Sequence, residues 1–170
     1  PYLQVGTTIG RIAVRLLEGP PESLLIRYQG DIAKEDIKPV KVAVLAGLLE
    51  SLTDERVNMV NADIIASRRG LYVTEQKESS CENYANMVTV EVNTKSGNTL
   101  VAGSSLRGKT HLVRVGDYWL EIEPTGSYMV FTEHKDRPGM IGAVGTIIGD
   151  ADVNISQMQV SRGVHRGGKQ

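Results

Sequence analysis

Cysteine is scarce in this 170-residue sequence, which contains only Cys81. One cysteine forms neither an internal disulfide nor a cysteine-rich metal site, and it is more typical of a cytoplasmic protein than of a secreted one. Long apolar runs are missing too, because none approaches the roughly 20 residues that span a bilayer. The 19 basic and 20 acidic residues leave a net charge of −1. We therefore expect a cytoplasmic protein that binds no metal, no nucleic acid and no membrane.

Motifs for cofactor chemistry are also missing, since the sequence contains no G-x-G-x-x-G. The nearest approach is a set of glycines spaced by 3, 3 and 4 residues: Gly139, Gly142, Gly145 and Gly149. This spacing places them on one face of a helix, whereas a dinucleotide site needs its glycines in the turn before the helix. We expect this face to pack closely on a sheet. None of the three histidines has the context of a catalytic His–carboxylate pair, so we expect no catalytic residue.

Hydrophobic periodicity predicts an α+β domain over residues 1–123. Apolar residues at helical spacing indicate helices at about 9–17, 38–52 and 60–69. Alternating patterns indicate a strand at 24–29 and two hairpins, 87–92 with 99–105 and 110–115 with 118–123. These strands predict a mixed or antiparallel sheet. The Pro-Thr-Gly break at 124–126 marks a boundary, after which residues 124–170 predict a strand, the glycine-rich helix and another strand.

The loop before the glycine-rich helix carries groups that suit a zwitterionic amino acid. Pro138 fits the first helical position, and the amides that follow it favour a carboxylate. Asp136 is an acceptor for an ammonium, His134 is placed to close over a ligand, and Asn154 offers donors and acceptors. The same residues also fit an Asp cap, an exposed histidine and a turn asparagine without any ligand. Residue chemistry alone leaves both interpretations open.

A second candidate site lies in the hairpins, where Lys109, His111 and Arg114 are candidates for binding a phosphorylated metabolite. Strand alternation places Lys109 and His111 on one face with Val113, and Arg114 on the other. This predicts that the cations are divided between two faces. The alternative is that they are solvated charges that keep the sheet soluble.

Two groups of motifs resemble known domains. The stretch "DRPGMIGAVGTIIGDADVNISQMQVSR" resembles the first half of an ACT domain, a ligand-binding module of amino-acid metabolism. Upstream, "YQGDIA", "LAGLLE", "VNMVNADIIASRRGLYVTE" and "LVAGSS" resemble the intervening, or allosteric-substrate-binding, domain of long-form D-3-phosphoglycerate dehydrogenases. The resemblance covers nearly the whole chain, in the same domain order.

The resemblance implies an intervening α+β domain over 1–123, followed over 124–170 by the N-terminal part of a ferredoxin-like (βαββαβ) ACT domain. It implies a regulatory fragment of an enzyme that oxidises 3-phosphoglycerate with NAD, the first step of L-serine biosynthesis. The start at "PYLQ" rather than Met agrees with a cut from a longer protein. The catalytic and NAD-binding domains would lie outside this chain, which would itself hold no cofactor.

The resemblance also implies L-serine, or a related amino acid, as effector. The motif match places its contacts at His134, Asp136 and Asn154, with the backbone of Pro138, Gly139 and Met140 beside them. It further implies self-association through ACT edge strands. Because the second half of the ACT pattern is not seen before the sequence ends, the effector site is expected to depend on what completes it.

Two other interpretations remain open. The β-type subunit of iron–sulfur L-serine dehydratase joins the same two domains, but it carries a serine-rich segment that this sequence does not resemble. A stand-alone ACT regulator of amino-acid metabolism is the other, although no helix-turn-helix pattern suggests work on DNA.

Overall fold

The computed structural model describes residues 1–125, 128–134 and 137–161, which include every candidate site residue except Asp136. Contacts within the chain divide its described residues into two compact units, Pro1–Pro124 with Ser161, and Thr125–Val160. Each unit is described by itself below.

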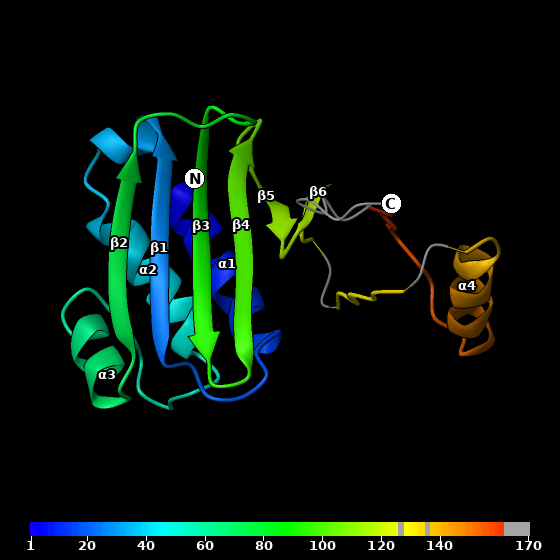
Figure 1. The fold of residues 1–170 in the computed structure, drawn as a ribbon, viewed down its shortest axis with the longest axis horizontal. Coiled ribbons are helices and arrows are strands. Elements are labelled where there is room, and N and C mark those ends of the chain that lie inside the picture. Colours follow the sequence, from blue (N-terminus) through cyan, green and yellow to red (C-terminus); the bar gives the residue numbers. More distant parts are fainter. Residues whose placement is uncertain (126–127, 135–136, 162–170) are drawn as a thin grey trace, which may run out of the picture. The chain divides into compact units, whose positions relative to one another are not determined.

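The first unit is a six-stranded sheet with helices on one face (Figure 1). Its helices are α1 (Tyr2–Arg15), the short 3-10 helix η1 (Asp31–Lys34), α2 (Lys38–Leu49) and α3 (Ala62–Arg68). Its strands are β1 (Ser23–Gly30), β2 (Tyr72–Glu78), β3 (Asn86–Thr94), β4 (Gly97–Leu106), β5 (Lys109–Val115) and β6 (Tyr118–Ile122). The strand order is β2-β1-β3-β4-β5-β6. Only β1 and β2 pair in parallel, so the predicted mixed sheet is confirmed.

One strand, β2, was not predicted from the sequence. It follows α3 and pairs in parallel with β1, which completes a strand–helix–strand crossover. Its sequence, YVTEQKE, has too few apolar residues to show the alternation of a half-buried strand. Because β2 is the edge of the sheet and most of it is exposed, burial does not demand that alternation.

The main core lies between the sheet and the two long helices. In β1, residues at alternate positions are buried, among them Leu24, Ile26 and Tyr28. They pack with Ile9 of α1 and Leu48 of α2, both also fully buried. The hydroxyl of Tyr28 donates to Glu75 at 3.1 Å. Burial, with the Glu75 carboxylate beside it, raises the pKa of the Tyr28 hydroxyl, which therefore remains a donor across the ordinary pH range.

Glycine lets α1 and α2 touch at their backbones. A Cβ at Gly10 would collide with the carbonyl oxygen of Val44, and one at Gly47 would collide with the carbonyl oxygen of Thr7. The two helices therefore approach each other more closely than any residue with a side chain at these positions would permit. Close packing through glycine, which the sequence suggested for the second unit, is found here instead.

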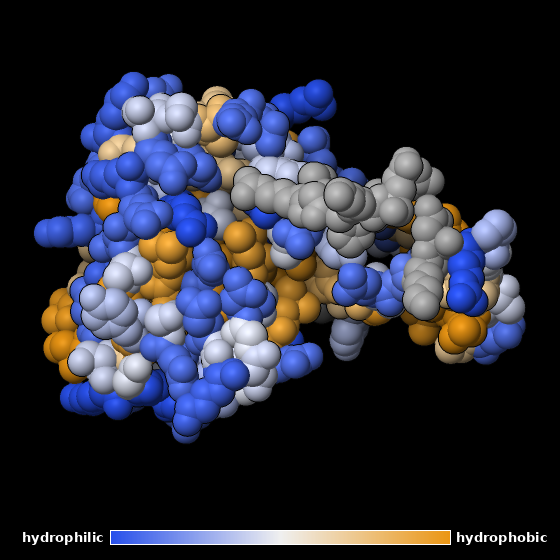
Figure 2. All heavy atoms as spheres, in the orientation of Figure 1, coloured by the Kyte–Doolittle hydropathy of each residue, from blue (hydrophilic) through white to orange (hydrophobic). Residues whose placement is uncertain are grey.

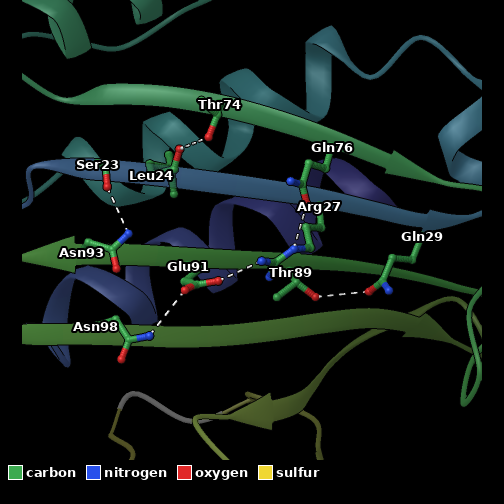
Figure 3. Close-up of polar contacts among 10 residues, drawn as sticks. All are labelled: Ser23, Leu24, Arg27, Gln29, Thr74, Gln76, Thr89, Glu91, Asn93 and Asn98. Atoms are coloured by element: carbon green, nitrogen blue, oxygen red, sulfur yellow. Dashed lines mark hydrogen bonds and ion pairs between the residues drawn. The ribbon is translucent and has the colours of Figure 1, made fainter.

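The opposite face of the sheet carries a row of polar contacts across four strands (Figure 3). Arg27 of β1 donates to Gln76 of β2 at 3.0 Å and pairs with Glu91 of β3 at 3.0 Å. The amide of Asn98 in β4 donates to the same carboxylate at 3.4 Å. We call this row the polar ladder; it consists of Gln76, Arg27, Glu91 and Asn98. Within it the charges of Arg27 and Glu91 compensate each other.

The second unit contains α4 (Met140–Asp150), which confirms the predicted helix. The predicted strands on either side are wrong for this structure, since residues 128–134 and 151–161 form no strand. The physical reason is that a strand requires a partner, and no described residue of this unit supplies one. The expected packing of the glycine face on a sheet is wrong as well, because a Cβ at Gly142, Gly145 or Gly149 would meet nothing within 4 Å. A ferredoxin-like arrangement therefore stays a prediction.

We predict that Gly47→Ala lowers the free energy of unfolding of the first unit by about 2 kcal/mol, because the new methyl group forces α1 and α2 apart. Urea denaturation followed by circular dichroism measures the change. The matched control is Gly145→Ala, where space is open and the alanine favours the helix. Equal stability of the wild type and Gly47→Ala would contradict the close backbone contact.

Candidate functional sites

The N-terminal end of α4 borders a small hollow of about 320 Å³. Its lining residues are His134, Arg137, Pro138, Gly139, Met140, Ile141, Gly142 and Val160. Gly139 is the N-cap residue, with a φ of 89°. Pro138 therefore precedes the cap. The prediction that Pro138 is the first helical residue is wrong. Three residues of the first helical turn, Met140, Ile141 and Gly142, line this hollow, and the Met140 amide donates to the carbonyl oxygen of Arg137 at 3.4 Å.

The structure brings together four of the six proposed effector residues. His134, Pro138, Gly139 and Met140 line the hollow. Asn154 is exposed and is not among the lining residues, and Asp136 lies outside the described residues. The first amides of a helix have no acceptor within that helix, and the helix dipole favours an anion beside them. The hollow therefore suits a small carboxylate, while the described residues do not show what would hold its amine.

A β-bulge brings the three hairpin cations to one face of the sheet. Lys109 pairs with Leu106, His111 with Ser104 and Arg114 with Ala102. Because 102, 104 and 106 alternate along β4, their partners share a face. The register shifts between Ala102 and Gly103, whose partners are Arg114 and Leu112, so Val113 is the extra residue that makes this possible. The predicted division of the cations between two faces is therefore wrong.

These cations already have partners in the protein. The Lys109 ammonium lies 2.9 Å from the Glu123 carboxylate. Nδ1 of His111 is 3.2 Å from the carbonyl oxygen of Lys109. The Arg114 guanidinium stacks over Trp119 at 5.2 Å from the ring centroid, and its Nε donates to the carbonyl oxygen of Gly116 at 2.8 Å. The Arg114 guanidinium also lies 3.8 Å from the Asp117 carboxylate. An anion would therefore compete with Glu123 for Lys109 and, more weakly, with Asp117 for Arg114.

A small apolar cluster supports this cationic face. It comprises the buried residues Met87, Ala102 and Val113, with Cys81, Tyr84 and Trp119 packed against them. The rings of Tyr84 and Trp119 stack with centroids 6.4 Å apart. Partial burial, with the Glu121 carboxylate nearby, raises the pKa of the Tyr84 hydroxyl. Sequence reasoning missed both the Arg114–Trp119 contact and the Lys109–Glu123 pair, although both follow from the hairpin register once the bulge is known.

A larger hollow of about 450 Å³ lies over α1 and the end of α2. Its walls include Arg11 and Glu50, whose side chains form a two-point ion pair with a shortest distance of 2.6 Å. This pairing satisfies both charges, and the hollow presents no catalytic arrangement. Among the described residues no group of three metal-ligating side chains comes together. No helix in the described ranges is long and apolar enough to cross a membrane.

The structure is thus an α+β protein of two units, in which a mixed sheet with one helical face is followed by a unit built on a glycine-rich helix. Comparison with protein families assigns a family to each unit. The D-3-phosphoglycerate dehydrogenase intervening domain matches residues 1–116, and the ACT domain matches residues 128–169. The chain belongs to the D-3-phosphoglycerate dehydrogenase intervening-domain family, which confirms the resemblance read from the sequence.

Similar curated proteins carry the same enzyme name. D-3-phosphoglycerate dehydrogenase of Synechocystis is 36% identical over 169 residues, covering 98% of this chain and 30% of the relative. The enzyme of Bacillus subtilis is 35% identical over 163 residues, covering 95% and 31%. That of Methanocaldococcus jannaschii is 33% identical over 162 residues, covering 95% and 30%. The chain therefore spans less than a third of the length of these relatives.

We predict that the cationic face can be altered without unfolding the sheet. Lys109→Gln removes a largely exposed ion pair, so it should change the free energy of unfolding by less than about 1 kcal/mol. Trp119→Ala uncovers Met87, Ala102 and Val113 and should cost about 2 kcal/mol. Thermal unfolding of the two variants beside the wild type provides the comparison. A larger loss in Lys109→Gln than in Trp119→Ala would show that the cation, rather than the ring, supports the hairpins.

Proposed function

We propose that the chain is the regulatory part of a D-3-phosphoglycerate dehydrogenase, with an intervening domain over 1–123 and an ACT domain beginning at 124. The observation that carries this proposal is the match of both families in this order, together with relatives that bear the enzyme's name. The whole protein would oxidise 3-phosphoglycerate in the first step of L-serine biosynthesis, in the cytoplasm. Within it, this chain would sense metabolites rather than carry out the oxidation.

NAD is the cofactor that this activity implies for the whole protein. The chain itself offers no phosphate-binding turn of the dinucleotide type, because its sequence contains no G-x-G-x-x-G. The residues described here therefore do not fit NAD, and the proposal assigns the cofactor to other domains.

For the second unit we propose an effector site at the N-terminal end of α4 that binds L-serine or a related amino acid. The hollow lined by His134, Pro138, Gly139 and Met140 would take the carboxylate at the first helical amides. Asp136 and Asn154 would hold the ammonium. Because an amino acid carries both a carboxylate and an ammonium, it would be bound by the helix amides at one end and by Asp136 and Asn154 at the other.

We propose further that two copies associate through the segments beside α4. Large apolar side chains are exposed in these segments, among them Tyr128, Val130, Val153 and Val160. In the described residues of this unit they have no sheet to join. Pairing with the edge of a second ACT unit would bury them and give the chain the strand partners that it otherwise does not have.

For the first unit we propose that Lys109, His111 and Arg114 bind a phosphorylated metabolite. Their placement on one face by the bulge supports this function more strongly than the sequence did. The Lys109–Glu123 pair opposes it, because the bound anion must displace a carboxylate.

Isothermal titration of the chain with L-serine tests the effector site, with D-serine and glycine as controls. We expect heat that is specific to L-serine and is lost in Asp136→Ala, since the ammonium then has no carboxylate partner. Asp150→Ala, at the other end of α4, is the matched control and should bind as the wild type does. The titration uses a chain concentration at which dimers form.

The outcomes separate the parts of the proposal. Absence of heat from the chain, followed by binding once a complete ACT sequence is supplied, would assign the failure to missing strands and keep the regulatory function. Absence of heat from both would refute L-serine as effector.

Fluorescence of Trp119, the only tryptophan in the chain, tests the anion site. Because Arg114 lies over the ring, we expect emission to change on titration with inorganic phosphate or 3-phosphoglycerate. Arg114→Gln should weaken binding roughly tenfold through loss of a charge-assisted hydrogen bond. Glu123→Gln should strengthen it, because the Lys109 ammonium is then released. Lys95→Gln, in the turn between β3 and β4, is the charge-matched control, and a loss of affinity equal to that of Arg114→Gln would refute a specific site.

A further inference from the structure

The free edge of β2 has the properties of a pairing surface. β2 is an outer strand of the sheet and bonds only to β1, in an unbroken parallel register over seven residue pairs. The strand contains no proline, and its pairing with β1 shows no bulge. Residues 75–78 are exposed. Proteins usually protect such an edge with proline, a bulge, a covering segment or charged side chains. β2 has no proline and no bulge, but it carries the charged residues Glu75, Lys77 and Glu78.

Hydrogen bonding to β1 determines which residues face the free edge. The N–H of Tyr72 donates to the carbonyl oxygen of Glu22, on the β1 side. In a parallel ladder the residues that bond to a given neighbour alternate along the strand. The N–H and C=O groups of Val73, Glu75 and Lys77 therefore point to the free edge, while those of Gln76 point to β1.

These constraints leave few registers for antiparallel pairing of β2 with a second copy of itself. A two-fold axis at Glu75 would place two glutamates directly opposite each other, which is unfavourable. An axis at Gln76 places Glu75 of each copy opposite Lys77 of the other. Both of these residues have outward backbone groups, so each such pair also exchanges two backbone hydrogen bonds. Charge and hydrogen bonding thus favour the same register.

The side chains at this edge have capacity for such a contact. Lys77 makes one long contact, with its Nζ 3.4 Å from the carbonyl oxygen of Glu35, and two of its three donors remain for other acceptors. Glu75 accepts from the Tyr28 hydroxyl through one oxygen, and its other oxygen is 3.5 Å from Lys41. A lysine from a second copy would complete the partly satisfied Glu75 carboxylate.

Exposed apolar side chains lie next to the same edge. α3 lies beside β2, and apolar surface gathers there (Figures 1 and 2). The residues are Met59, Val60 and Ile64, with Tyr72 at the start of β2, and they are between 51% and 85% exposed. A second copy paired at β2 would cover part of this surface, which adds apolar burial to the backbone hydrogen bonds.

We propose that β2 joins two copies of this chain by antiparallel pairing centred on Gln76, which makes one continuous twelve-stranded sheet from two six-stranded ones. This interface belongs to the first unit and is independent of the pairing proposed for the second.

Disulfide trapping tests the register. Gln76→Cys is made in the full chain together with Cys81→Ser, so that the native thiol does not react. At the two-fold axis the two Gln76 positions form a non-hydrogen-bonded pair, the arrangement with the closest side chains. We expect covalent dimers under mild oxidation. Glu78→Cys is the matched control, because residue 78 is exposed as residue 76 is. In this register the two Glu78 positions of the dimer are offset by four residues along the strand, or about 13 Å at roughly 3.3 Å per residue.

Charge reversal provides a second measurement with the same readout. Lys77→Glu, added to Gln76→Cys, places a carboxylate opposite Glu75 in both of the symmetry-related pairs, and we expect the trapping rate to fall roughly tenfold. Lys95→Glu makes the same charge change away from β2 and should leave the rate unaltered. Equal trapping of Gln76→Cys and Glu78→Cys, or no trapping of Gln76→Cys, would overturn the proposal. Because the disulfide forms at β2, dimers that associate through the second unit do not alter the comparison between these variants.

Discussion

Backbone contact between α1 and α2 is the constraint on which the first unit depends. The glycines Gly10 and Gly47 allow the two helices to lie side by side on one face of the sheet. The sheet makes room for α1 in the same way, because a Cβ at Gly103 of β4 would come within 2.7 Å of Ile9 and 2.9 Å of Val5. Removal of side chains at these points lets a sheet of six strands be covered by only two long helices. It also places most of the buried apolar residues of β1 and β3 on that face.

The other face carries polar side chains (Figure 3) beside the small apolar cluster of Met87, Ala102 and Val113, and its charges are not equally accessible to a ligand. In the middle of the sheet Arg27 is held between Gln76 and Glu91, and both members of the ion pair are largely screened from water. At the β5 end, Lys109 is paired only with a partly exposed carboxylate. An anion that approaches this face finds Arg27 already paired within the polar ladder. At the hairpins it can compete with Glu123 for Lys109. The ladder thus contributes to order across the strands, whereas the hairpin end is the part of this face that suits ligand exchange.

The sequence was sufficient wherever burial imposed a period. Helices α1 and α2 and the strands β1, β3 and β4 all have regular buried apolar positions, and they were found. β2 was missed because an edge strand with polar residues on both faces has no such period. The grouping of Arg114 with Lys109 was missed because alternation assumes an unbroken ladder, and one bulged residue reverses every later side chain. The strands beside α4 were predicted from the sequence pattern, but a strand exists only where a partner supplies hydrogen bonds.

The exposure of α4 links the effector binding and the self-association that are proposed for the second unit. In the described residues no side chain of α4 is buried, and Ile141 and Ile147 are more than half exposed. A carboxylate at the N-terminal end of this helix would stay in contact with water, where the attraction of helix amides is weak. A second copy that covers the apolar segments would also exclude water from the hollow, and so strengthen the same attraction. An effector that binds only the associated form then shifts the equilibrium towards association by mass action. The effector and the interface would in this way act on one equilibrium, which is the physical requirement for a regulatory unit.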